Sequence, residues 1–230
     1  MKKIFLVLVT ALFALTASGQ HRKVSIIPTI GYQVSTPLDQ KGDYGYYRPM
    51  HRFRAGVDAD LILMDRVGVY FSLKPGLYYS AEGLTASNEG MLYAIDPDTP
   101  GPGLELYPVE LNYLEVPVLA QLGFRVDPAL SVYINVGPYL AYGVSGKISN
   151  LNFYRIKGEG SEHVTELDPF KAGYNRFDWG FQGGFGVEYM RVQLGFGVQV
   201  GLQNMGESAD YLRSEKTTTQ TMFVTLGYRF

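Results

Sequence analysis

The chain has 230 residues and a formal net charge of -2, so its charge gives no indication of a nucleic-acid-binding surface. Its 27 Gly, 18 Tyr and 13 Phe favour β structure over a helical bundle. It has no cysteine, which excludes a lipidated cysteine, a disulfide framework and a cysteine nucleophile.

The N-terminal segment, residues 1–19, is typical of a secretory signal peptide. Met1-Lys2-Lys3 is basic, residues 4–15 are almost all apolar, and the small residues 17–19 precede the expected cleavage position. The apolar run has about 12 residues, whereas a helix needs roughly 20 to cross a bilayer, which favours cleavage over anchoring. We therefore expect residues 20–230 to form a single exported domain.

Three segments with apolar residues at every second position follow, and this period predicts β-strands. They cover residues 24–34, 52–63 and 67–79. The polar row of the second segment is charged, with Arg52, Arg54, Asp58 and Asp60. A short turn at residues 64–66 predicts that the second and third strands form a hairpin.

Five further segments repeat this pattern, which brings the number of predicted strands to eight. They cover residues 114–124, 132–144, 177–189, 192–202 and 221–230. In the last strand one face is apolar and ends on an aromatic residue. It resembles the signal by which bacterial outer-membrane barrels are recognised for assembly, and we assign this role to Met222, Val224, Leu226, Tyr228 and Phe230.

The number and length of the strands suit a membrane barrel, because tilted strands of about 9 to 11 residues cross a bilayer. Short turns near 64–66, 126–130 and 189–191 alternate with longer connections near 35–50, 81–110, 146–175 and 204–217. We predict an all-β fold: an eight-stranded antiparallel up-and-down transmembrane β-barrel with short periplasmic turns and long extracellular loops. The expected location is the outer membrane of a Gram-negative cell.

A secreted soluble barrel of the lipocalin type is the competing interpretation, since its strands also alternate but place apolar residues inside. The polar rows are rich in glycine and glutamine, which suit a narrow lumen, and this favours the membrane barrel. Aromatic residues at the strand ends predict two girdles. The loop-end girdle is Tyr32, Phe53, Tyr79, Tyr142, Phe177 and Trp179, and the turn-end girdle is Phe124, Tyr189, Tyr228 and Phe230.

Four prolines fit this assignment least well, because a proline removes a donor from the ladder. Pro28, Pro75, Pro117 and Pro138 all lie within predicted strands. A closed barrel has no edge at which they can sit, so we expect local β-bulges at some of these positions.

The register predicts a charged lumen made of Arg52, Arg54, Asp58, Asp60, Lys74, Glu115, Asp178, Glu188 and Arg229. We expect Arg52 and Arg54 at the outer level with Glu115 and Asp178. Lys74 should lie nearer Asp58 and Asp60, and Arg229 near Glu188 at the periplasmic level. An eight-stranded barrel holds little beyond its own side chains, so we predict a closed barrel without sustained ion conductance.

Several motifs resemble the PorT-type outer-membrane β-barrel family. They are Asn112-Tyr113-Leu114-Glu115-Val116-Pro117-Val118-Leu119, Asn135-Val136-Gly137-Pro138-Tyr139, Phe177-Asp178-Trp179-Gly180, the glycine-rich residues 183–189 and the ending 224–230. The resemblance implies an eight-stranded barrel in the outer membrane. One named member of that family is associated with the type IX secretion apparatus.

Residues for catalysis or metal binding are few, with His21, His51 and His163 as the only histidines. Ser161 and Glu162 beside His163 could belong to a serine hydrolase of lipids. We favour the interpretation that they are solvated loop residues, because adjacency in sequence does not create a catalytic triad. We expect no enzyme activity, cofactor or metal.

The favoured function is a structural or interaction barrel that acts through its extracellular loops. An accessory subunit of an envelope secretion system and an outer-membrane lipid-modifying enzyme are the alternatives. Expected partners are outer-membrane lipid, the barrel assembly machinery and an envelope or surface protein that the sequence does not identify, with no nucleic acid.

Overall fold

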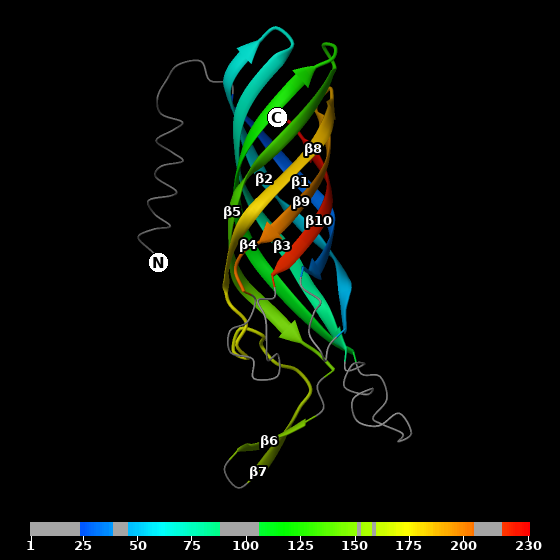
Figure 1. Cartoon of the computed structure of the whole chain (residues 1–230), viewed down its shortest axis with the longest axis vertical. Coiled ribbons are helices and arrows are strands. Elements are labelled where there is room, and N and C mark those ends of the chain that lie inside the picture. Colours follow the sequence, from blue (N-terminus) through cyan, green and yellow to red (C-terminus); the bar gives the residue numbers. More distant parts are fainter. Residues whose placement is uncertain (1–23, 39–45, 88–105, 151–152, 158–159, 205–217) are drawn as a thin grey trace, which may run out of the picture.

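The alternation of apolar and polar residues produces eight strands that close into one antiparallel barrel (Figure 1). The strands are β1 (Val24–Pro37), β2 (Tyr46–Arg66), β3 (Val69–Ser87), β4 (Leu106–Arg125), β5 (Leu130–Ile148), β8 (Phe177–Tyr189), β9 (Val192–Gly201) and β10 (Thr219–Tyr228). Their order around the barrel is β1-β10-β9-β8-β5-β4-β3-β2. The predicted fold class is confirmed.

The structure is a computed structural model that describes residues 24–38, 46–87, 106–150, 153–157, 160–204 and 218–230. The predicted signal peptide at residues 1–19 lies outside the described residues. Within the described ranges, no helix is long and apolar enough to cross a membrane.

The connections divide the barrel into two different ends. Short turns join β2 to β3, β4 to β5 and β8 to β9 at one end, which is at the top of Figure 1, and the start of β1 and the end of β10 lie at this end too. The longer connections lie at the opposite end. In outer-membrane barrels the short turns face the periplasm, so we call these the periplasmic and outer ends.

Four neighbouring strands are longer than the sequence pattern predicts. β2 to β5 contain 21, 19, 20 and 19 residues, whereas β1, β8, β9 and β10 contain 14, 13, 10 and 10. The additional residues at the outer end fall in segments expected to be loops. A strand beyond the bilayer needs no apolar outward face, so the alternation ends before the backbone ladder does.

A small hairpin was also missed in the segment expected to be a loop at residues 146–175. It consists of β6 (Phe153–Lys157) and β7 (Gly160–Val164), which form a separate two-stranded sheet. The hairpin lies beyond the outer end of the barrel (Figure 1).

The predicted bulges at prolines are wrong. In the β3–β4 ladder, Pro75 pairs with Val118 and the next pair, Tyr78 with Glu115, keeps the same register. A proline removes one hydrogen-bond donor but adds no residue, so the strand continues past it without a shift.

The other predicted positions behave in the same way. Pro117 pairs with Tyr139, Pro28 with Val57 and Pro138 with Phe181, each within a constant register. The register shifts occur elsewhere, between Pro49 and Arg54, between Ile62 and Met64, and between Asn112 and Tyr113.

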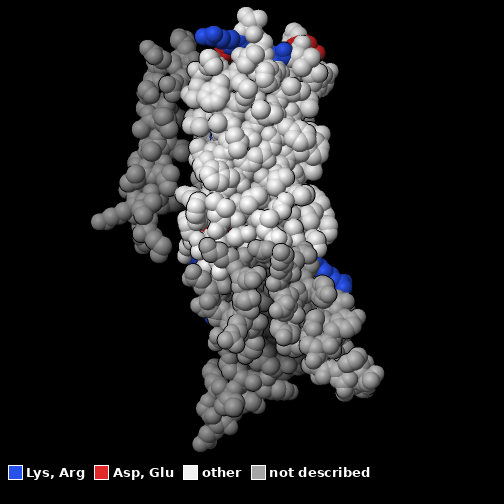
Figure 2. Space-filling model, viewed as in Figure 1, with Lys and Arg blue, Asp and Glu red and all other residues white. Residues whose placement is uncertain are grey.

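The outer wall of the barrel carries the apolar rows. Ile30, Phe181, Phe185 and Leu226 are each more than half exposed, whereas the alternate positions are mostly buried inside the barrel. On the face shown in Figure 2, the described wall between the two ends shows almost no charged atoms. Apolar residues that point outward contradict the lipocalin-type arrangement and provide a surface for lipid.

Candidate functional site in the barrel lumen

All nine residues predicted to form a charged lumen lie inside the barrel, eight at inward positions of the strands and Arg229 directly after the end of β10. Strand pairing fixes these positions, since a slip of one residue would turn a whole row toward lipid. The site is therefore the lumen itself.

At the periplasmic level, Arg229 bridges two carboxylates from other strands. Its Nη1 lies 2.7 Å from Asp60 Oδ2, and its Nη2 donates to Glu188 Oε2 at 2.8 Å. Its Nε also donates to Glu188 Oε1 at 2.9 Å. The expected proximity of Arg229 to Glu188 is observed. Asp60 pairs with Arg229 rather than with Lys74.

A second group of polar side chains continues this network toward the middle of the lumen. Lys74 Nζ lies 3.1 Å from Asp58 Oδ2 and donates to Gln193 Oε1 at 3.4 Å. Gln193 Nε2 donates to Glu188 Oε2 at 2.6 Å, and the Tyr78 hydroxyl donates to Asp58 Oδ2 at 2.7 Å. The periplasmic half of the lumen thus contains one connected hydrogen-bond network.

Arg54 fills the next level and is the largest fully buried side chain. Its Nη2 donates to Glu115 Oε1 at 3.0 Å. Its guanidinium carbon lies 4.6 Å from the centre of the Tyr78 ring and 4.2 Å from that of Phe223. An ion pair and two aromatic faces together compensate for removing this charge from water.

A small cavity remains between these two levels. It has a volume of about 40 Å³, and its lining includes Arg54, Lys74, Asn135 and Gln182. Arg54 Nε and Nη1 and Gln182 Oε1 are buried and have no hydrogen-bond partner among the described residues. Such a space accommodates roughly three water molecules, which could provide partners for these polar atoms of two lining residues.

Two buried carboxylates near the outer end have only neutral partners. Asp178 Oδ2 accepts a hydrogen bond of 2.7 Å from the Tyr139 hydroxyl. Glu82 Oε1 accepts from Ser80 Oγ and Gln199 Nε2, each at 3.3 Å. Neither carboxylate forms an ion pair with a described residue. The expected pairing of Asp178 with Arg52 or Arg54 is therefore wrong, and Glu82 was not predicted because its part of β3 was assigned to a loop.

Arg52 also differs from the prediction. Its Nη1 lies 2.9 Å from Glu110 Oε1 and its Nη2 donates to Asn112 Oδ1 at 3.3 Å, so it does not share Glu115 or Asp178. The reason is the extra length of β4, which carries Glu110 into the ladder opposite Lys147 of β5. The sequence pattern placed residues 81–110 in a loop, and this partner was missed.

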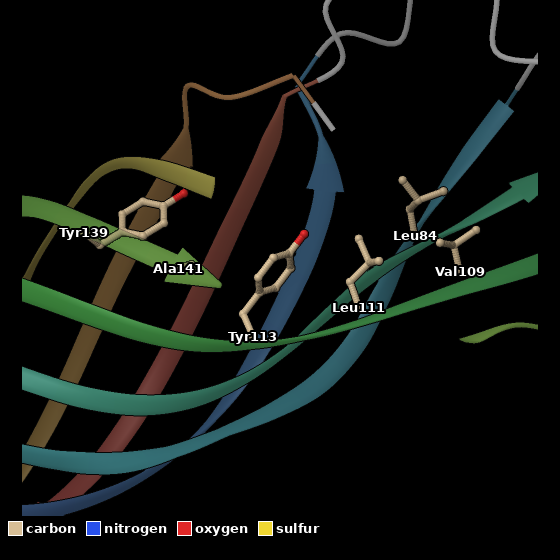
Figure 3. Packing of buried hydrophobic residues seen from close by; sticks show 6 residues of the cluster. All are labelled: Leu84, Val109, Leu111, Tyr113, Tyr139 and Ala141. Atoms are coloured by element: carbon tan, nitrogen blue, oxygen red, sulfur yellow. The ribbon is translucent and has the colours of Figure 1, made fainter. Parts of the chain in front are cut away.

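Apolar side chains occupy the interior beyond the charged levels (Figure 3). The cluster, which we call the outer plug, consists of Leu84, Val109, Leu111, Tyr113, Tyr139 and Ala141 from β3, β4 and β5. Ile148, Phe170 and Tyr174 pack against it. An apolar cluster inside the barrel was not expected, because its members lie on strand segments assigned to loops or on rows read as polar.

The segment at residues 165–176, which we call the strap, packs against the outer plug. Ile148 and Leu167 exchange backbone hydrogen bonds of 2.8 and 3.0 Å. Phe170 packs edge-on against Tyr113 with ring centres 6.2 Å apart. Arg176 lies 4.6 Å from the Phe170 ring and donates to Gly143 O at 3.0 Å. These contacts hold the strap against the inside of the outer mouth.

The residues assigned to the assembly signal occupy the wall and the periplasmic end. Met222, Val224, Leu226 and Tyr228 of β10 are exposed on the outer face. Phe230 packs edge-on against Tyr228 at 4.9 Å, and its backbone N–H donates to Ile26 O at 2.9 Å.

The sequence comparison decides the family. The model of the outer membrane protein beta-barrel domain matches residues 16–206. The chain belongs to this family. It is accordingly an outer-membrane β-barrel protein, and the predicted location in the outer membrane is confirmed. No curated protein matches the sequence.

Similar solved structures have low sequence identity. The chain is 13% identical to the outer membrane protein OprG from Pseudomonas aeruginosa, with 91% of this chain and 97% of that chain covered and a TM-score of 0.46. It is 12% identical to Ail, the attachment invasion locus protein of Yersinia pestis, with 90% and 99% covered and a TM-score of 0.39. Neisserial surface protein A is 9% identical, with 92% and 100% covered and a TM-score of 0.39.

Proposed function

We propose that this outer-membrane barrel is a closed structural or interaction protein, which engages partners at its outer end and does not conduct solutes. The filled lumen is the observation that carries the proposal. Arg229, Lys74 and Arg54 bridge different strands at successive levels, and the outer plug follows them. A pore of this strand number has little free volume once its side chains are packed.

The outer end supplies the surface for such an interaction. The additional length of β2 to β5 carries one half of the wall outward, and the β6–β7 hairpin lies beyond it (Figure 1). The strap fixes the base of this extension through Phe170 and Arg176. Connections that project from a rigid barrel are suitable for recognition, because the scaffold holds them in place.

Planar-bilayer recordings of the purified, folded protein test the closed lumen. We expect no reproducible open channels. The matched variant removes the Arg52–Glu110 pair at the outer level by replacing both residues with alanine, and it should also remain closed because Arg54 and the plug are intact. Reproducible channels from the folded wild-type protein would move the function to a pore.

An epitope inserted at Gly160 in the β6–β7 hairpin tests the orientation. Antibody should label it on intact cells. Labelling only after permeabilisation would contradict an outward-facing hairpin and with it the interaction at the outer end.

Two other functions remain alternatives. The motif resemblance to PorT-type proteins favours an accessory subunit of an envelope secretion system, and proteins isolated with the barrel from cross-linked outer membranes would distinguish this from a surface role. A lipid-modifying enzyme has less support. The residues that suggested it, Ser161, Glu162 and His163, are neighbours in β7, and adjacency in sequence does not create a triad. Lipid analysis of a deletion strain tests this alternative.

A further inference from the structure

The three short turns at the periplasmic end each expose an apolar side chain, and we call these three side chains the apolar tips. We call residues 65–68, 125–129 and 189–191 the periplasmic rim. Val67 is 104% exposed, Val126 is 64% exposed and Met190 is 65% exposed. Single exposed apolar residues are ordinary on a protein surface, but one in each of the three short turns is a repeated feature.

The rim is a continuous hydrogen-bonded structure. Arg125 N donates to Gly68 O at 2.8 Å and joins the first two turns, and Met190 N donates to Ala129 O at 2.6 Å and joins the third. Arg125 also makes a two-bond ion pair with Asp65, at 2.6 and 3.1 Å. The three apolar tips are therefore held in fixed relative positions, which lowers the entropy lost when a partner binds.

Two exposed cations stand beside the apolar tips. Arg66 precedes Val67, and Arg191 follows Met190. Both side chains are exposed, and neither forms an ion pair within the part of the chain that the structure describes. Arg125 differs from them because Asp65 occupies its guanidinium. The rim thus presents two guanidinium groups that are available to carboxylates of another molecule.

The side chains at the tips are not those that turn geometry favours. Met190 has a φ of 56°, a left-handed conformation that glycine or asparagine adopts at lower cost. Val67 gains no burial within the chain. These residues favour neither the turn conformation nor exposure to water, so we infer that they serve an interaction with another molecule rather than the fold.

The position of the tips indicates which kind of molecule they meet. The β2–β3 turn, which contains Val67, extends along the barrel axis at the periplasmic end (Figure 1) and lies beyond the pair of Val69 with Phe124 at the end of the β3–β4 part of the wall. To insert into the bilayer around the barrel, an apolar side chain of this turn would have to bend back toward that wall. We propose that the periplasmic rim docks a periplasmic protein whose surface has apolar sockets flanked by carboxylates. Three tips and two arginines fit a small, transient interface.

Photo-crosslinking in the intact cell tests this proposal. Benzoylphenylalanine is placed at Val67, Val126 or Met190, and at Val144 on the outer half of β5 as the matched exposed control. The adducts are identified by mass spectrometry. We expect one and the same periplasmic protein at the three rim positions and not at Val144, with Asp or Glu in the cross-linked peptide.

Charge variants give the test a second readout. Arg66→Glu combined with Arg191→Glu should reduce the adduct yield at Val126 by about tenfold, because like charges then face each other across the interface. Arg66→Lys combined with Arg191→Lys should keep most of the yield. Heat-modifiable migration shows that both variants are folded barrels.

Three results would overturn the proposal. Lipid adducts at the rim positions would place the tips in the headgroup layer. Different or no protein adducts at the three positions would remove the docking face. An unchanged yield after charge reversal would show that the arginines take no part. The rim lies at the opposite end from the outer extension, so these results are independent of the function proposed for that end.

Discussion

Arg54 and Glu115 form an ion pair of 3.0 Å across the lumen, and the two side chains are 1% and 0% exposed. Arg54 belongs to β2 and Glu115 to β4, so the pair joins strands that are separated by β3. The pair therefore links parts of the wall that no backbone ladder connects. Each of the two charges is stabilised mainly by the other, because water is largely excluded at this level of the lumen.

Removing one partner of this pair should destabilise the barrel strongly. In Glu115→Ala the buried guanidinium of Arg54 loses its counter-ion, and we expect the free energy of unfolding to fall by about 3 to 5 kcal/mol. Arg54→Met combined with Glu115→Leu should recover most of this loss, since Tyr78 and Phe223 provide an apolar slot. Urea unfolding of the purified protein in a fixed lipid or detergent measures both variants.

The outer pair is the matched control for this experiment. Arg52 and Glu110 are 21% and 35% exposed, so Glu110→Ala should change the free energy of unfolding by about 0 to 1 kcal/mol. If Glu115→Ala and Glu110→Ala lowered the free energy of unfolding equally, burial would not determine how much these ion pairs contribute to stability.

Met190→Asn should stabilise the protein. The φ of 56° at this position strains a methionine, whereas asparagine tolerates the left-handed region, and we expect a gain of about 1 kcal/mol. The measurement is the urea midpoint with an unchanged denaturant slope. Met190→Ala retains the strain and should give no gain. If alanine and asparagine were equally stabilising, loss of the exposed methionine side chain would be the cause instead.

Gly143→Ala should displace the strap. A Cβ at Gly143 would lie 2.2 Å from Cζ of Phe170, so the ring must move away, at a cost of about 1 to 3 kcal/mol. Hydrogen exchange should become faster at the amides of Ile148 and Leu167, which bond to each other, while the amides of β9 keep their protection.

Gly183→Ala is the control for this prediction. Its Cβ would meet nothing closer than 3.4 Å, so we expect no change in exchange at Ile148 or Leu167. Unchanged protection of these two amides in Gly143→Ala would contradict the view that the Phe170 ring holds the strap.

The sequence was sufficient to predict the barrel, the up-and-down strand order and the inward row, because strand length, alternating short and long connections and polar rows rich in glycine and glutamine add to the period-two pattern. Lipid on one side and a narrow lumen on the other keep that pattern strict in the part of the wall that crosses the bilayer. Beyond the bilayer this constraint ends, and the outer parts of β2 to β5 were read as loops. Glu82, Glu110 and the outer plug lie in that region or depend on it.

Side-chain pairing could be predicted only in part. The pairs of Arg54 with Glu115 and of Arg229 with Glu188 follow from register and level. Asp178 was expected to meet an arginine, but it bonds to Tyr139, whose row had been read from Asn135, Gly137 and Gly143 as polar. Periodicity assigns a residue to a face and a height, whereas the partner depends on strand tilt and side-chain length.

Deleting Phe230 should reduce the amount of protein in the outer membrane more than it reduces stability. The ring is 69% exposed and packs against the edge of Tyr228, so the deletion removes little packing and one backbone hydrogen bond, from Phe230 N to Ile26 O. If the assembly machinery recognises the alternating apolar face of β10, loss of its last aromatic residue weakens this recognition while the folded barrel remains intact. The heat-modifiable band in outer-membrane fractions measures the level, and urea unfolding measures the stability.

Tyr189→Ala separates this effect from a general loss of girdle aromatics. Tyr189 is also exposed at the periplasmic end but belongs to β8, so its removal should leave the outer-membrane level nearly unchanged. Phe230→Tyr should retain the wild-type level because an aromatic ring is kept. An equal decrease in the Phe230 deletion and in Tyr189→Ala would assign the effect to anchoring in the membrane interface, and no decrease in the deletion would remove Phe230 from the assembly signal.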